Sequence, residues 1–187
     1  MTERAGRDAL ARARELSLAG LLGALGLLLP IGFHALGPAG RVFLPMHLPI
    51  VVAGFVVGPA TAAGLGLIVP LLSAVLTGMP PLAPPIALLM SLELMVKATL
   101  ASVLYRSLRL PIWLVLPVAL LVDWAVLAVA AVVAADFFAI EAGPVQYVWG
   151  VILLSVPGTL LQLAVVPLGV AAIERRVPRL ALARKKR

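Results

Sequence analysis

Long apolar stretches, separated by short clusters of proline, glycine and charged residues, dominate this chain. Each stretch is apolar on all sides rather than on one face, which is typical of helices that lie in lipid or inside a protein. A membrane-spanning helix needs about 20 apolar residues, and the alternation typical of a β-barrel strand does not occur. The predicted helices are Leu16–Leu36, Leu44–Val57, Ala60–Thr77, Pro85–Tyr105, Pro111–Ala135 and Val145–Ile173.

The second predicted helix is too short to cross a bilayer upright, and the third is marginal. A tight turn that begins with Gly58 and Pro59 joins them. Irregular backbone at membrane depth is tolerated only where protein or water covers it, as in the broken helices of transporters. We therefore expect a cavity beside this pair of helices. A re-entrant hairpin that binds no ligand would explain the same lengths.

Composition supports the membrane assignment. Apolar residues make up 63% of the 187 positions and charged residues 12%, whereas soluble domains have about 45–50% and about 25%. A soluble enzyme and a disordered chain are therefore disfavoured. Cysteine is absent, which excludes disulfides, thiolate catalysis and cysteine metal sites. We predict an all-α integral membrane protein with a segment 1–15, a single six-helix membrane domain 16–174 and a basic tail 175–187.

The charges are distributed unevenly along the chain. The segment 1–15 contributes +1 to the net charge of +7, the membrane domain −1 and the tail +7. The two ends and the turn with Arg106 and Arg109 hold 13 of the 15 basic residues, and the opposite loops hold only Arg41. The positive-inside rule then predicts that both termini are cytoplasmic. A basic tail can also bind nucleic acid, but nucleic-acid binding would not explain the apolar body.

Three charged residues interrupt the predicted helices. Glu93 and Lys97 are spaced i,i+4, so they share a face and can pair. The rise per residue places Asp123, on the next helix, level with Lys97. Such residues mark a polar substrate site or a proton relay, although an ion-pair network that only locks the two helices would use the same groups. A site with both signs of charge suits a zwitterionic or hydrogen-bonding heterocycle better than a strongly charged ion.

Polar and aromatic residues gather at the predicted outer side. His34, Arg41 and His47 flank the first loop, and Thr77 precedes the third. They are either a gate over a pocket or interfacial hydrogen-bonding residues. Two histidines without cysteine make a poor zinc site, so we expect no metal.

Tyr147 and Trp149 lie near the start of the last predicted helix. Aromatic residues at this position usually anchor a helix at the membrane interface. They could equally stack on a flat ligand.

Small residues form a stripe along the first predicted helix. Ala19 with Gly23, and Gly20 with Ala24, are small-xxx-small pairs of the kind that let helix backbones approach closely in lipid. Such pairs also arise by chance in helices rich in alanine and glycine. We interpret the stripe as a docking face for another membrane subunit.

Several catalytic motifs are missing. The sequence has no G-x-x-x-x-G-K-[ST] loop, no H-E-x-x-H and no G-x-S-x-G. We therefore expect neither ATP hydrolysis by this chain nor any other enzymatic activity, and no cofactor.

The whole chain resembles the substrate-binding S components of energy-coupling factor (ECF) vitamin transporters. The matching segments are AGLLGA at 19–24, LPMHLPIVVAGFVVGP at 44–59 and GLGLIVPLLS at 64–73. In that family the first helix carries an Ala-x-x-x-Ala contact for the coupling subunit, for which this chain has Ala19/Gly23 and Gly20/Ala24. The glycine expected three residues after the Gly-Pro turn is Ala62 here.

This resemblance implies six helices with cytoplasmic termini and a pocket near the outer face, closed by the first and third loops. It also implies a transmembrane coupling subunit and two ABC ATPases as partners. The chain would bind a small water-soluble vitamin or precursor at the plasma membrane of a prokaryote. Its contacts would come from polar residues of the fourth and fifth helices, from the loop lid and from stacking aromatics: Glu93, Lys97, Asp123, His47, Arg41, Thr77, Tyr147 and Trp149.

Two other functions fit the same residues. One is a stand-alone carrier in which Asp123 or Glu93 takes up the proton that drives uptake. The other is a membrane scaffold without transport activity, in which the charges only lock helices.

Overall fold

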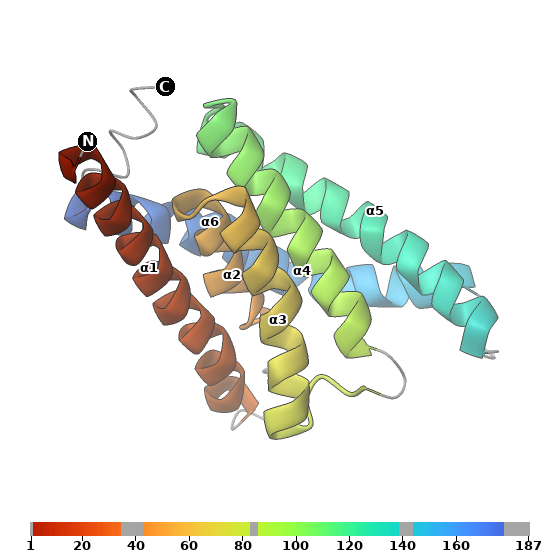
Figure 1. Ribbon diagram of the computed structural model, residues 1–187. Helices are drawn as coiled ribbons and strands as arrows, with labels where there is room; N and C mark the ends of the chain where they lie inside the picture. Colours follow the sequence, from red (N-terminus) through yellow and green to blue (C-terminus); the bar gives the residue numbers. More distant parts are fainter. Residues whose placement is uncertain (1, 35–42, 83–85, 139–143, 178–187) are drawn as a thin grey trace.

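The computed structural model describes residues 2–34, 43–82, 86–138 and 144–177, and all regular elements in these ranges are helical (Figure 1). This confirms the predicted all-α class. The elements are α1 (Thr2–His34), α2 (His47–Val56), α3 (Pro59–Thr77), α4 (Ile86–Ser102), the π-helical turn η2 (Val103–Ser107), α5 (Ile112–Phe138) and α6 (Pro144–Arg176).

In the part of the chain that the structure describes, five helical segments are long and apolar enough to cross a membrane: Asp8–Phe33, Pro59–Thr77, Ile86–Ser107, Ile112–Val129 and Ile152–Arg176. Large apolar side chains cover much of their outer surface, including Leu16, Ile68, Trp113, Leu121 and Leu168. A soluble monomer rarely exposes so much contiguous apolar surface, whereas lipid-facing helices do. The chain therefore has the architecture of a multi-pass membrane protein.

The predicted helix Leu44–Val57 is present as the shorter α2. Its ten residues rise about 15 Å, half of the roughly 30 Å of a bilayer core. All ten are buried, and α2 contacts α1, α3, α4 and α6 (Figure 1). A segment that is apolar all round is thus the centre of the bundle rather than a lipid-facing helix.

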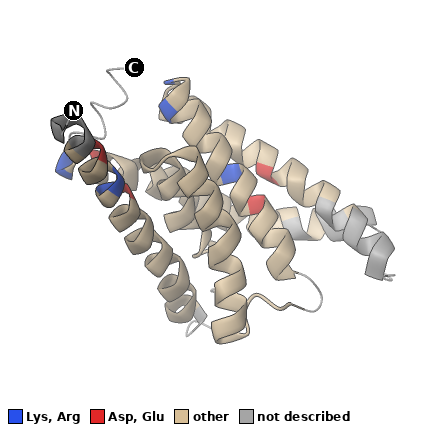
Figure 2. Ribbon diagram, in the orientation of Figure 1, with Lys and Arg blue, Asp and Glu red and all other residues tan. Residues whose placement is uncertain are grey.

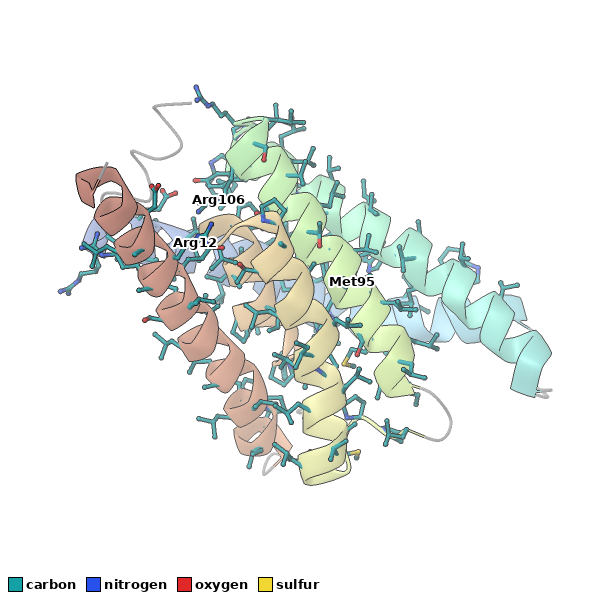
Figure 3. The ribbon with its side chains drawn as sticks, viewed as in Figure 1. Arg12, Met95 and Arg106 are labelled. Carbon is teal, nitrogen blue, oxygen red and sulfur yellow. The ribbon has the colours of Figure 1, made fainter. Side chains whose placement is uncertain are left out.

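Polar side chains satisfy the backbone where α2 ends. The carbonyl of Val56 accepts a hydrogen bond from Arg106 (Nη1) at 2.6 Å, and the carbonyl of Val57 accepts one from Ser102 (Oγ) at 2.8 Å. Figure 3 shows the Arg106 side chain at this end of the bundle, the same end as Arg12 of α1. Helix ends leave carbonyl groups unsatisfied, so these donors allow α2 to stop inside the bundle.

The start of α3 is satisfied by α1. Glu15 (Oε1) accepts hydrogen bonds from the amide of Gly58 at 2.8 Å and from Thr61 (Oγ1) at 2.6 Å. A carboxylate is favourable at a helix N-terminus because it faces unpaired N–H groups and the positive end of the helix dipole. The predicted break between the second and third helices is therefore tied to α1 by Glu15, while the turn itself is partly exposed.

Helices α3 and α4 pack at backbone distance. A Cβ added at Gly66 would lie 2.5 Å from the amide nitrogen of Met95 and 2.6 Å from the carbonyl oxygen of Leu94. Figure 3 labels Met95 midway along α4. Glycine here lets the two helices touch, which holds α4 and its charged residues at a fixed depth.

The start of α1 and the end of α6 lie at the same end of the bundle. Helix α1 begins at Thr2, well before the predicted Leu16, because the segment 1–15 is rich in alanine, arginine and glutamate, which favour helix. A groove lined by residues of both helices, among them Arg14 and Arg176, places the start of α1 beside the end of α6. Figure 2 shows basic residues at this end and isolated charges midway along α4 and α5.

Candidate functional site

Four titratable side chains from three helices meet in the interior of the bundle. They are His47 of α2, Glu93 and Lys97 of α4, and Asp123 of α5. All four are buried, and Lys97 is completely inaccessible. We call this group the charge layer. The prediction from helical rise that Lys97 and Asp123 lie at one depth agrees with this structure.

The i,i+4 spacing predicted that Glu93 can pair with Lys97, but the charge layer contains other pairs. Lys97 (Nζ) donates a hydrogen bond to Asp123 (Oδ2) at 2.5 Å, across the α4–α5 interface. Glu93 (Oε1) lies 3.5 Å from His47 (Nε2) of α2. The i,i+4 spacing of Glu93 and Lys97 therefore does not make them each other's closest partner, because each finds one on another helix.

Hydrogen-bonding capacity remains unused in this interior. Among the described side chains, four buried polar atoms lack a hydrogen-bond partner: His47 (Nδ1), Asp123 (Oδ1) and both amide atoms of Gln162. An unsatisfied buried polar atom costs free energy, and in a native protein such atoms often mark a site that a water, ion or ligand completes. These atoms could therefore accept or donate further hydrogen bonds.

Gln162 is a residue that the sequence analysis missed. It lies on α6, completely buried, and follows the buried residues Ser155 and Thr159 at helical spacing. Polar residues spaced i, i+4 and i+7 share one face of a helix. Because the rest of this stretch is apolar, the spacing predicts that these three polar side chains face the interior of the bundle.

A cavity of about 310 Å³ opens beside the charge layer. Its wall comes from the end of α1, the segment that leads into α2, the α3–α4 connection and the start of α4, and it is mainly apolar. Helix α2 begins at this wall with His47, so one side chain belongs both to the cavity and to the charge layer. The lining residues are Pro30, Phe33, Leu44, Pro45, Met46, His47, Met79, Pro80, Pro81, Ile86 and Met90.

Lys97 and Asp123 do not line this cavity, and neither does Glu93, which reaches it only through His47. The expectation that a ligand meets both signs of charge directly is therefore not what the geometry offers. Lys97 is fully buried and its ammonium group is held by Asp123. Within the described residues, the only titratable group at the cavity wall is the imidazole of His47.

The other predicted contacts lie apart from the cavity or outside the described residues. Thr77 is exposed, and its hydroxyl bonds the carbonyls of Ser73 and Met79 at the end of α3. Trp149 is 60% exposed on α6, as expected of an interfacial anchor. Arg41, and the side chains of His34 and Tyr147, lie outside what the structure describes.

The small-residue stripe of α1 divides into two faces. Ala19 and Gly23 are buried, and a Cβ added at Gly23 would lie 3.1 Å from Leu65 of α3. Gly20 and Ala24 are exposed, and nothing lies within 4 Å of a Cβ added at Gly20. The first pair is therefore used for packing inside this chain, and docking of another subunit remains a prediction for Gly20 and Ala24.

Comparison with protein-family models, curated proteins and solved structures finds no significant match to this chain. The class defined by the fold is a multi-pass helical membrane protein with a buried charge layer beside an apolar cavity.

Proposed function

We propose that this protein is the substrate-binding subunit of an ECF-type importer and takes a small water-soluble vitamin or precursor into the cavity. The observation that carries the proposal is the cavity itself, which ends on His47 of the buried charge layer. Binding sites of this kind are mostly apolar, with a few convergent polar groups that fix the ligand's orientation. The imidazole of His47 lines the cavity and has an unpaired Nδ1, so it supplies such a group.

The position of the cavity also supports the proposal. Its wall includes Leu44–His47 and Met79–Pro81, the ends of the two loops that close the pocket in the family this sequence resembles. The topology we propose has six crossings with cytoplasmic termini, the second made by α2 together with the segment before it. The outer half of that crossing would then be the cavity wall, and the inner half the buried α2.

Partner subunits complete the proposed importer. Energy would come from two ABC ATPases through a transmembrane coupling subunit, since this chain has no P-loop. The exposed face with Gly20 and Ala24 would dock the coupling subunit. The complex would work in the plasma membrane of a prokaryote.

The proposal is tested by what the protein binds. Protein purified from membranes in mild detergent is denatured, and the released small molecules are identified by mass spectrometry. The ligand-free protein is then titrated with a panel of water-soluble vitamins and precursors. We expect one retained or tightly bound compound, and co-expression with a coupling subunit and its ATPases should give ATP-dependent uptake of that compound. A panel with no binding would contradict the proposal.

A stand-alone proton-coupled carrier is the second candidate. The observation that favours it is a buried layer with two carboxyl groups, one ammonium group and one imidazole, because such groups form proton relays in transporters. Uptake that persists without any ATPase and stops when an uncoupler is added would favour this carrier over the importer subunit.

A further inference from the structure

The charge layer holds more acidic than basic groups. Glu93 and Asp123 supply two carboxyl groups, and Lys97 supplies the single ammonium group. With a neutral His47 and both carboxyl groups ionised, the layer carries one surplus negative charge. Burial of such a surplus is unfavourable unless a positive charge neutralises it.

The neighbouring helices do not neutralise this surplus. Helix α3 has no titratable side chain. Among the described side chains of α1 and α6, the charged residues lie at the other end of the bundle, where Glu15 caps α3 and Glu174 accepts a hydrogen bond from Tyr105. The other polar group in this interior, Gln162 of α6, is uncharged. The described residues thus supply no further cation, and a proton or a ligand can provide the neutralising charge.

The cavity suits an apolar body with one positive group. Met46, Met79 and Met90 give its wall an adaptable surface. Phe33 adds an aromatic ring, whose face attracts cations. Within the described residues, no ammonium or guanidinium group lines the wall, and an anionic ligand would lie beside the surplus negative charge.

We propose that this cavity selects a small organic cation, a ring-containing body with one positively charged nitrogen, and that the cation replaces a proton held by the charge layer. The inference rests on the proposed function and specifies its substrate class. His47 lies between the cavity and Glu93, so it would transmit the negative charge of Glu93 to the bound cation. The unpaired Nδ1 of His47 would form a hydrogen bond with the ligand.

Three probes that share a pyridine ring separate charge from shape. They are 1-methylnicotinamide, which is a fixed cation, nicotinamide, which is neutral, and nicotinate, which is an anion. Each is titrated into the full-length protein in lipid nanodiscs, and binding is measured by calorimetry. We expect the cation to bind at least about tenfold more tightly than nicotinate, a free-energy difference of about 1.4 kcal/mol.

The pH dependence tests the exchange with a proton. Because 1-methylnicotinamide does not titrate, a change in its affinity reports on the protein. Its affinity should rise with pH, by at most about tenfold per pH unit for the displacement of one proton, because the deprotonated layer carries the full surplus charge. The affinity of nicotinamide should change much less. A cation affinity that is independent of pH would overturn the proton exchange.

Variants test whether the surplus charge is the cause. Glu93→Gln removes one carboxylate and should abolish both the preference for the cation and its pH dependence. Asp123→Asn removes the same charge at the other carboxyl group, and serves if Glu93→Gln does not fold. Thr99→Ala is the matched control on α4, since the Thr99 hydroxyl bonds only the carbonyl of Met95 on its own helix. It should bind like the unmodified protein.

The possible outcomes separate this inference from the proposed function. Nicotinate bound as tightly as the cation, or an anionic compound found in the vitamin screen, would overturn the substrate class and leave a binding subunit in place. A cationic vitamin found in that screen would support both the binding subunit and the cationic substrate class, even if the three probes are too small to bind. Failure of every probe and every vitamin would overturn both.

Discussion

Lys97 bonds Asp123 of the neighbouring helix at 2.5 Å, although Glu93 lies one turn away on its own helix. This choice leaves Glu93 to face His47. The same charge layer therefore has two parts. One part joins α4 to α5, and the other reaches the cavity through α2.

The first prediction concerns the buried ion pair. Lys97→Met should destabilise the protein by about 3–5 kcal/mol, because it leaves the Asp123 carboxyl group without its cation. The double variant Lys97→Met/Asp123→Leu should recover most of this loss, since a buried ion pair can often be replaced by apolar side chains. Unfolding of the detergent-solubilised protein measures both effects. A double variant no more stable than Lys97→Met would contradict this view of the pair.

The second prediction concerns the contact between α3 and α4. Gly66→Ala should destabilise the protein by about 1–3 kcal/mol, because the added methyl group meets the backbone of α4. Gly64→Ala is the matched control on the same helix, where nothing lies within 4 Å of the added Cβ. It should be neutral or slightly stabilising. Thermal unfolding midpoints compare the two, and equal midpoints would argue against the close approach.

The third prediction separates the two faces of α1. Gly23→Leu should destabilise the isolated chain, because its side chain would collide with Leu65 of α3. Gly20→Leu should leave the isolated chain stable and weaken only its co-purification with a coupling subunit. If Gly20→Leu assembles normally, the docking surface lies elsewhere. Monodispersity after gel filtration and pull-down yield provide the two measurements.

The fourth prediction concerns topology, and the absence of cysteine makes it direct. Leu82, after α3, and Ser107, after α4, are both exposed. A membrane-impermeant maleimide should label Leu82→Cys in intact cells and Ser107→Cys only after permeabilisation. The cysteine-free parent is the background control. The reverse pattern would contradict the proposed cytoplasmic side of the α4–α5 turn.

Some features of the site could be predicted because they depend only on distance along one helix. The rise of a helix gave the depth of Lys97 and Asp123. The second and third apolar stretches are short compared with the thickness of a bilayer, and this gave the break between those two helices. The polar stripe Ser155, Thr159 and Gln162 has the same origin and could have been predicted from its spacing.

Other features depend on how the helices are rotated and cross, which spacing does not specify. Ala19 and Gly20 are equally small neighbours in the sequence, yet one packs inside and the other is exposed. Thr77 and His47 were both expected at the lid. The Thr77 hydroxyl instead bonds the backbone of its own helix end, while His47 lines the cavity.

The sequence by itself determined that this is a helical membrane protein, because the cost of placing polar groups in lipid leaves a strong mark on composition and segment length. It also determined which few charged residues lie in the interior. Only the tertiary structure decided their partners. Ion pairs form over a few ångströms, and the packing of α4 against α5 and against α2 sets those distances between residues far apart in the chain.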